Sequence, residues 1–175
     1  MNTKAHIVAA FYELVCKEAF DKLTVQDILD AADVSRSTFY RIFRDKYDLL
    51  DYFCESLILR IMSKVQEPRK GSLWREILNS IEQNKPFYIA IYQKDGHDTY
   101  EALMTREMSR RLGGDVMAEH GRTKLTREEE LMLEFTVAGL TRVVRNWVKA
   151  GFPDSPEYVA EVSLQLVPEL YRKYL

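Results

Sequence analysis

Cations and hydroxyl groups are concentrated between residues 36 and 46, and these are the side chains whose types and spacing could do chemistry. This stretch holds a single acid, Asp45, and four cations: Arg36, Arg41, Arg44 and Lys46. A local excess of positive charge attracts phosphate groups, and arginine also matches the hydrogen-bonding edge of guanine. Because the whole chain carries a net charge of −2, we expect any nucleic-acid contact to come from this local patch.

Other kinds of chemistry have little support in the sequence. His6, His97 and His120 are scattered, and Cys16 and Cys54 lie in apolar helical patterns without a Cys or His at ligand spacing. A glycine loop that could bind phosphates and a serine or zinc hydrolase motif are also absent. The sequence therefore predicts no enzyme, no metal site and no cofactor, and the cysteines are expected to be reduced thiols in the core of a cytoplasmic protein.

No stretch of the sequence looks like a membrane span or a secretion signal. An apolar run of about eighteen residues, which a membrane-spanning helix requires, does not occur. The first residues, MNTKAHIVAAF, lack the charged start and long apolar core of a signal peptide. We therefore expect no membrane partner.

Two short helices must position the cationic stretch. Thr24 can cap a helix that runs to about Ala32, with Asp27 three residues later as an acidic variant of the capping box. Asp33 tolerates the left-handed backbone that the following turn often requires, and Ser35 can cap a second helix from Arg36 to about Phe43. The spacing predicts two helices joined by a tight turn.

The second helix has distinct inner and outer faces. Phe39, Ile42 and Phe43 are three or four residues apart and are expected to pack inward. The spacing leaves five polar side chains facing outward, where they could enter a major groove: Arg36, Ser37, Thr38, Tyr40 and Arg41.

The order of these parts resembles the N-terminal domain of the TetR family of bacterial regulators. The resemblance lies in AADVSRSTFYRIFRDKYDLL, and its specific part is the spacing Ser-x-x-Thr-Phe-Tyr-x-x-Phe-x-x-Lys-x-x-Leu-Leu, from Ser35 to Leu50. It implies an all-α protein with a three-helix helix-turn-helix domain at 1–46. A helical effector-sensing and dimerisation domain would follow at 47–175. Two glycines usual in the family are missing, one from the connector at 20–23 and one where Asp33 stands.

The resemblance assigns roles to the polar residues of this domain. Base edges would be contacted by Arg36, Ser37, Thr38 and Arg41, and phosphates by Tyr40 and Lys46. Additional candidates for DNA contact are Thr24, Ser35 and Arg44, while Lys4 and His6 would lie near the DNA backbone. The competing interpretation of all these residues is an ordinary solvated helix surface.

Apolar periodicity predicts further helices along the rest of the chain. The expected helices span residues 5–19, 47–66, 72–84, 87–93, 100–112, 126–150 and from 156 onward, with breaks at 67–71 and 94–98. Gly113 and Gly114 are expected to interrupt a helix and to precede a loop, and Pro168 to kink or weaken the last helix.

Aromatic and methionine side chains in the second domain form the candidate effector pocket. Its members are Phe87, Tyr88, Tyr92, Tyr100, Met104, Met108, Phe135 and Trp147, with Arg142 as a charge for an anionic ligand. A packed core explains the same set.

The helices at 126–150 and from 156 onward are the candidate dimer interface, because two copies of such a pair can form a four-helix arrangement. The predicted interface residues are Leu133, Val137, Leu140, Val144, Val148, Val159, Val162 and Leu166. From pattern alone, a core within one chain competes on equal terms. The resemblance favours a homodimer that reads a palindromic operator in double-stranded DNA.

The short length and the W-x-x-x-G-F-P-x-S-P pattern from Trp147 resemble a subgroup of TetR-like proteins related to the dihydroxyacetone-kinase operon regulator. In such a protein, control could come from a small-molecule ligand or a protein partner, and regulation could be repression or activation. The alternative hypothesis is a protein-interaction module or co-regulator with weak DNA binding.

Overall fold

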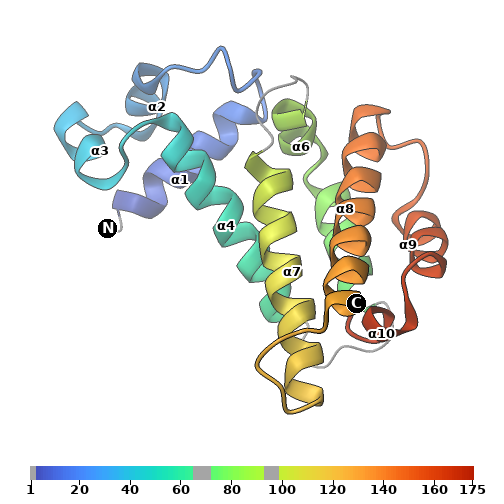
Figure 1. Cartoon of the computed structure of the whole chain (residues 1–175). Coiled ribbons are helices and arrows are strands. Elements are labelled where there is room, and N and C mark those ends of the chain that lie inside the picture. The colour runs from blue at the N-terminus through green and yellow to red at the C-terminus, as the bar shows by residue number, and fades with distance from the viewer. Residues whose placement is uncertain (1–2, 65–71, 93–98) are drawn as a thin grey trace.

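Three short helices form one end of the molecule in the computed structural model, which describes residues 3–64, 72–92 and 99–175 (Figure 1). These helices, which we call the head, are α1 (Thr3–Val15), α2 (Val25–Ala32) and α3 (Arg36–Ile42). Ile7 and Phe11 of α1 and Ile28 of α2 are fully buried between them. This small core holds the helices together while their outer faces stay exposed.

The helix α4 (Lys46–Lys64) connects the head to the remaining helices. Leu49, Leu50 and Cys54 are buried along it. Further along, α4 packs against α5 (Ser72–Gln83) and α7 (Thr99–Glu119), while α1 also contacts α6 (Lys85–Tyr92). The head is therefore joined to the rest of the molecule both by α4 and by the contact between α1 and α6.

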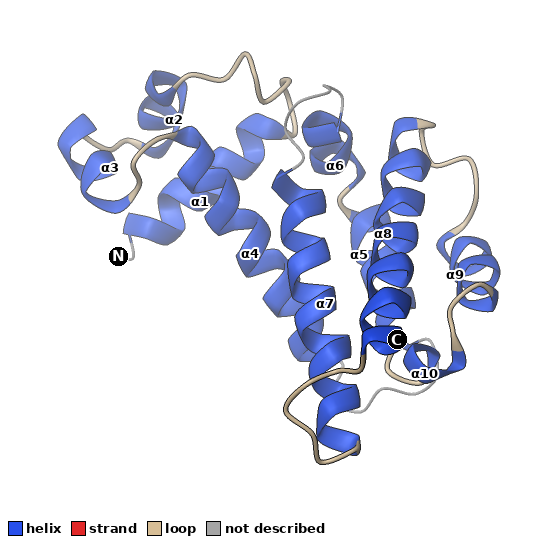
Figure 2. Ribbon diagram, viewed as in Figure 1, coloured by secondary structure: helices blue, strands red, loops and turns tan. Residues whose placement is uncertain are grey.

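The second half of the molecule, which we call the body, consists of α5 to α10. The long helices α7 and α8 (Arg127–Lys149) lie side by side, and α9 (Pro156–Gln165) packs on α5 (Figure 2). The short α10 (Glu169–Arg172) contacts α7. In the described ranges every regular element is a helix, so the predicted all-α class is confirmed. None of the described helices combines the length and apolar character needed to cross a membrane.

Local capping sets the ends of the helices in the body. Thr126 and Glu129 form the predicted capping box at the start of α8, and the chain turns at Gly151 with a φ of 80°. Ser155 caps α9, and Pro156 stands in its first turn. Pro168 separates α9 from α10, because a proline cannot donate the backbone hydrogen bond that a continuing helix needs.

The predicted helix end at Gly113 and Gly114 is wrong, because α7 continues to Glu119. Leu112 and Val116 are both buried and extend the apolar face past the glycines. A Cβ atom at Gly113 would lie only 3.2 Å from Cδ2 of Leu133, so the glycine lets α8 approach closely. The predicted breaks at 67–71 and 94–98 lie outside the described residues.

Candidate nucleic-acid interface

Hydrogen bonds between near neighbours fix the start of α2 and α3. The hydroxyl of Thr24 accepts from the backbone nitrogen of Asp27 at 3.2 Å, and the Asp27 carboxylate accepts from the backbone nitrogen of Thr24 at 2.8 Å. The hydrogen bond from the Thr24 side chain, followed by that from its backbone, holds the pKa of Asp27 below its usual range. Ser35 caps α3 by accepting from the backbone nitrogen of Thr38 at 3.2 Å. The two predicted caps are confirmed.

The turn between α2 and α3 is made without glycine. Asp33 adopts the predicted left-handed conformation, with φ 48° and ψ 52°, and its backbone nitrogen bonds back to Asp30. The backbone nitrogen of Val34 bonds to the carbonyl of Leu29 at 3.1 Å. These bonds satisfy the last carbonyl groups of α2 and set the position from which α3 begins.

The outer surface of α3 is polar and the inner surface is aromatic. Phe39 is fully buried and Phe43 is nearly so, which confirms the predicted inner face. Tyr40 is 47% exposed and its ring contacts the edge of Phe39. The other predicted contact residues of this helix are exposed, except for the half-buried Thr38: Arg36, Ser37 and Arg41. The arrangement offers two guanidinium groups, hydroxyls and a phenol to a ligand that lies along α3.

Two of the predicted DNA-contacting arginines have hydrogen-bond partners on neighbouring helices. Arg36 donates to the side-chain oxygen of Gln26 at 2.9 Å, which links α3 to α2. Arg44 pairs with Asp48 at 3.2 Å, yet its side chain remains 84% exposed. Such a solvent-exposed pair is weak, and phosphate contact by Arg44 stays a prediction.

Lys46 anchors α4 to the connector between α1 and α2. Its ammonium group donates to the carbonyls of Phe20, Asp21 and Leu23 at 3.1, 3.1 and 2.7 Å. This connector has no glycine, and three of its carbonyl groups accept hydrogen bonds from Lys46. Phosphate contact by Lys46 stays a prediction, and its observed contacts give it a positioning role in the head.

The side chains predicted to line an effector pocket fall into two groups. Phe135 and Arg142 are exposed on the outer surface of α8, and the other seven are buried: Phe87, Tyr88, Tyr92, Tyr100, Met104, Met108 and Trp147. The helical repeat explains this separation, because positions 135 and 142 are seven residues apart and share one face of α8. Phe135 and Arg142 therefore do not line the interior as predicted.

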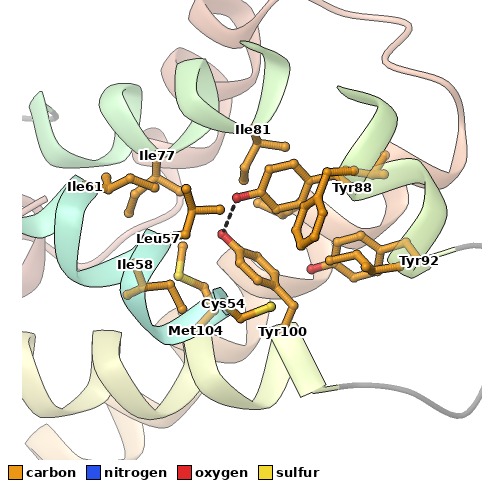
Figure 3. Close-up of a cluster of buried hydrophobic side chains, with 14 of the residues drawn as sticks. Cys54, Leu57, Ile58, Ile61, Ile77, Ile81, Tyr88, Tyr92, Tyr100 and Met104 are labelled. Carbon is orange, nitrogen blue, oxygen red and sulfur yellow. Dashed lines mark hydrogen bonds between the residues drawn. The ribbon is translucent and has the colours of Figure 1, made fainter. Parts of the chain in front are cut away.

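Four aromatic side chains of the buried group contact one another: Phe87, Tyr88, Tyr92 and Tyr100. Trp147 instead packs on Phe152. Tyr88 donates a hydrogen bond to the hydroxyl of Tyr100 at 3.0 Å, and Cys54, Ile58 and Met104 lie around the pair (Figure 3). Burial raises the pKa of both phenols, so both stay protonated at neutral pH. The packed-core interpretation of this cluster agrees with these contacts.

Most of the residues predicted to form a dimer interface are instead buried within one chain. The buried residues are Leu133, Val137, Leu140, Val144, Val148 and Val159, whereas Val162 and Leu166 are exposed. The first five lie on the face of α8 that α6 and α7 cover. The helix α8 has a second apolar face, which these two helices do not cover. For these six residues the intramolecular-core alternative was the correct one.

A different apolar surface, the α8–α9 face, is left exposed. Phe135 is 75% exposed and Leu166 is 76% exposed, and they lie with Gly139 and Val143 around an apolar hollow of about 140 Å³. The space above Gly139 is open. Along the sequence of α8, Phe135, Gly139 and Val143 recur at helical spacing and form a second apolar line beside the buried one. Exposed apolar surfaces of this kind mark contact sites on proteins.

Two family models match the chain. One, described as bacterial regulatory proteins of the tetR family, matches residues 7–53, which include α2, α3 and the connector held by Lys46. The other, described as a transcriptional regulator C-terminal region, matches residues 72–169 of the body. The first match therefore covers most of the head and the start of α4, and the second covers most of the body.

A curated relative and two solved structures are similar to the chain. The relative, the HTH-type dhaKLM operon transcriptional activator DhaS of Lactococcus lactis, is 26% identical over 97 residues. That match covers 53% of this chain and 50% of the relative, so the chain spans about half the length of the curated relative it matches.

The solved structures match almost the whole chain. A dihydroxyacetone kinase operon activator DhaS has a TM-score of 0.71 at 19% identity, and a TetR transcriptional regulator from Streptococcus agalactiae has 0.73 at 24%. Each match covers 95% of this chain and 94% of the other. At these identities the likeness shows a shared fold.

Proposed function

Since the chain belongs to the TetR family of bacterial regulatory proteins, we propose that it acts as a homodimer on a palindromic operator. It is a transcriptional regulator with a DNA-binding domain, and its relatives are regulators rather than enzymes. In the proposed complex, α3 of each protomer enters a major groove. Two heads then contact half-sites about one turn of DNA apart.

The observation that carries this proposal is the exposed polar surface of α3. Ser37, Tyr40 and Arg41 stand on the outer side of a helix whose inner side is fixed by the buried Phe39. A helix that is held firmly and presents arginine and hydroxyl groups can distinguish bases by hydrogen bonds. The exposed Arg44, just after α3, would add a phosphate contact that positions the head.

The α8–α9 face supports the homodimer part of the proposal. A two-fold axis through this surface would place Phe135 and Leu166 of one protomer against the same apolar surface of its partner. Gly139, which carries no side chain, would let the two α8 helices approach closely. We therefore assign the dimer contact to this face in place of the buried line through Val137 and Leu140.

Control of DNA binding by a small-molecule ligand or a protein partner is the remaining part of the proposal. The relative from Lactococcus lactis is named as an operon activator. That name supports activation as a possible outcome for this chain, beside repression. The interior cluster around Tyr88 and Tyr100 is filled by its own contacts. A ligand that binds there would have to displace those contacts, whereas a ligand that binds elsewhere would not.

Gel-shift titration with DNA from upstream of the protein's own gene and adjacent genes tests the DNA-binding proposal. We expect Arg41→Ala to weaken specific binding by about tenfold or more, since a bidentate contact with guanine contributes about 1–3 kcal/mol. Arg127→Ala is the matched control, because it removes an exposed arginine at the start of α8. If the wild type prefers none of this DNA over random DNA at moderate salt, the alternative of an interaction module with weak DNA binding takes its place.

A further inference from the structure

A groove of about 490 Å³ lies where the head meets the body. One wall is α1, from Lys4 to Tyr12, and the other is α4, from Tyr52 to Arg60, with Asn84 at the end near the body. Figures 1 and 2 show α4 crossing α1 as it leaves the head. The volume lies in the range of small-molecule sites. None of the buried residues predicted for the effector pocket is among its described lining residues.

Aromatic rings supply one part of its lining. The rings of Tyr12 and Phe53 are stacked with centroids 5.6 Å apart, and Tyr52 stands 37% exposed nearby. From α1, the groove is also lined by the small side chains Ala5 and Ala9, both of which are exposed. The small side chains of α1 leave space beside the rings of Tyr12, Tyr52 and Phe53 for a flat apolar body.

The charged residues described in the lining are both cations, with no acid among them. Lys4 places its ammonium group 3.6 Å from the centroid of the Tyr52 ring, and Arg60 is exposed about two turns further along α4. Two neighbouring acids of α4 have partners elsewhere: Asp48 pairs with Arg44, and Glu55 with Arg106 of α7. The groove therefore has positive charge beside its aromatic surface.

Polar groups at the body end of the groove fix its shape. The hydroxyl of Tyr12 donates to the side-chain oxygen of Asn84 at 3.0 Å, which ties α1 to the segment after α5. Burial raises the pKa of Tyr12, so this hydroxyl stays a donor at neutral pH. The amide group of Asn84 donates in turn to the carbonyl of Ser80 at 2.7 Å. This wall is therefore held by hydrogen bonds that do not depend on a ligand.

We propose that this groove binds a small aromatic carboxylate, whose ring stacks between α1 and the rings of α4 and whose carboxylate pairs with Arg60. The planar guanidinium group matches a carboxylate with two parallel hydrogen bonds, and Lys4 adds a second positive charge. A ligand in this groove would contact α1, which belongs to the head, and α4, which connects the head to the body. The effect of such a ligand on DNA binding rests on the proposed function, whereas binding itself does not.

Calorimetric titration of the full chain with 2-naphthoate, without DNA, tests this site. We expect saturable binding at sub-millimolar concentration and much weaker binding of the neutral 2-naphthamide. Arg60→Gln should lower the affinity for 2-naphthoate about tenfold, which corresponds to about 1.4 kcal/mol. Ala9→Phe should abolish binding by filling the space, and because both residues are exposed, circular dichroism should show an unchanged fold.

Arg142→Gln is the matched control, because it removes an exposed cation of α8 outside the groove and should leave the affinity unchanged. Three results would overturn the assignment: no binding to the wild type, equal binding of naphthoate and naphthamide, or unchanged affinity in both groove variants. Gel shifts with and without 2-naphthoate then report separately on DNA. Failure of the site and failure of the DNA-binding proposal are thus distinguishable.

Discussion

Asp33 has a backbone conformation that non-glycine residues rarely adopt, with φ 48° and ψ 52° at the end of α2. A side chain in this left-handed region clashes with the backbone, although aspartate tolerates it better than most residues. Glycine, which lacks Cβ, adopts it without steric cost. Asp33 is therefore compatible with the turn between α2 and α3, although glycine at this position would make the head more stable.

Glycine and valine at position 33 should change the free energy of unfolding in opposite directions. We expect Asp33→Gly to raise the free energy of unfolding by about 0.5–1 kcal/mol by relieving this strain, and Asp33→Val to lower it by about 1–2 kcal/mol. Urea unfolding followed by circular dichroism measures both values. A valine variant as stable as the glycine variant would show that the turn adopts another conformation.

Glu129 makes stability depend on pH through a depressed pKa. The hydrogen bond from Arg122 at 2.7 Å, followed by that from the backbone nitrogen of Thr126 at 2.7 Å, lowers its pKa from 4.5 to about 2. The folded state therefore holds the proton less tightly than the unfolded state. The stability that Glu129 contributes is complete above its ordinary pKa of 4.5 and is lost as the pH falls toward about 2.

Urea midpoints of the wild type and Glu129→Gln across this pH range measure the effect. The difference between the two proteins should be greatest above about pH 5 and should shrink toward about pH 2. Glu130→Gln is the charge-matched control from the same turn, since Glu130 forms only an exposed pair with Arg127. A constant difference between wild type and Glu129→Gln would contradict the role of this carboxylate.

At the scale of helices, α7 shows why spacing alone misplaced an end. Two adjacent glycines are poor helix formers, so local propensity predicts a break. The helix persists because Leu112 and Val116 are buried on either side of the pair and α8 packs against it. Caps such as Thr24 and Ser35 could be predicted because they depend on neighbours in the chain. The continuity of α7 depends on contacts with a distant segment.

The two glycines of α7 should respond differently to alanine. No atom lies within 4 Å of a Cβ built at Gly114, so Gly114→Ala should raise the free energy of unfolding by about 1 kcal/mol through helix propensity. At Gly113 the new methyl group would meet Leu133 at 3.2 Å, which offsets part of the gain. Thermal unfolding of the Gly113→Ala and Gly114→Ala variants tests whether the second is the more stable. Greater stabilisation by Gly113→Ala would contradict the prediction.

The helix α8 shows the same limit for the predicted interfaces. Its sequence has two apolar lines, and periodicity gives no information on which line meets the body. The line through Val137 and Leu140 is buried by neighbouring helices, while Phe135 stays exposed. Likewise, the aromatic residues of the second domain were identified as a group, but only the folded chain separates Phe135 from the buried cluster. The α1–α4 groove has no local pattern, because its lining comes from distant segments.

At the scale of the whole molecule, the α8–α9 face and the head lie on different sets of helices. A change on the face should therefore alter self-association without altering the surface of α3. Phe135 and Leu166 are the most exposed large apolar side chains among the residues that the structure describes, at 75% and 76%. Their exposure makes the face the natural place to test the proposed homodimer.

Phe135→Glu should convert the dimer to a monomer, because pairing would bury two unpartnered carboxylates in an apolar contact. Sedimentation velocity measures the change in mass, and operator affinity should fall with it. Leu59→Glu is the matched control, since Leu59 is 49% exposed on α4, away from this face. Equal masses for wild type and Phe135→Glu would reject the face as the dimer contact.

The first helix of the body depends on the last residues of the chain. Trp74 of α5 donates its indole hydrogen to the hydroxyl of Ser163 at 2.7 Å, and its backbone nitrogen donates to the carbonyl of Leu175 at 2.8 Å. During synthesis the head can assemble from near neighbours, whereas α5 must wait until α9 and Leu175 have left the ribosome. Until then the side of α5 that packs on α9 is uncovered, while α4 and α6 can already contact its other sides, so incomplete chains are exposed to aggregation and chaperone binding.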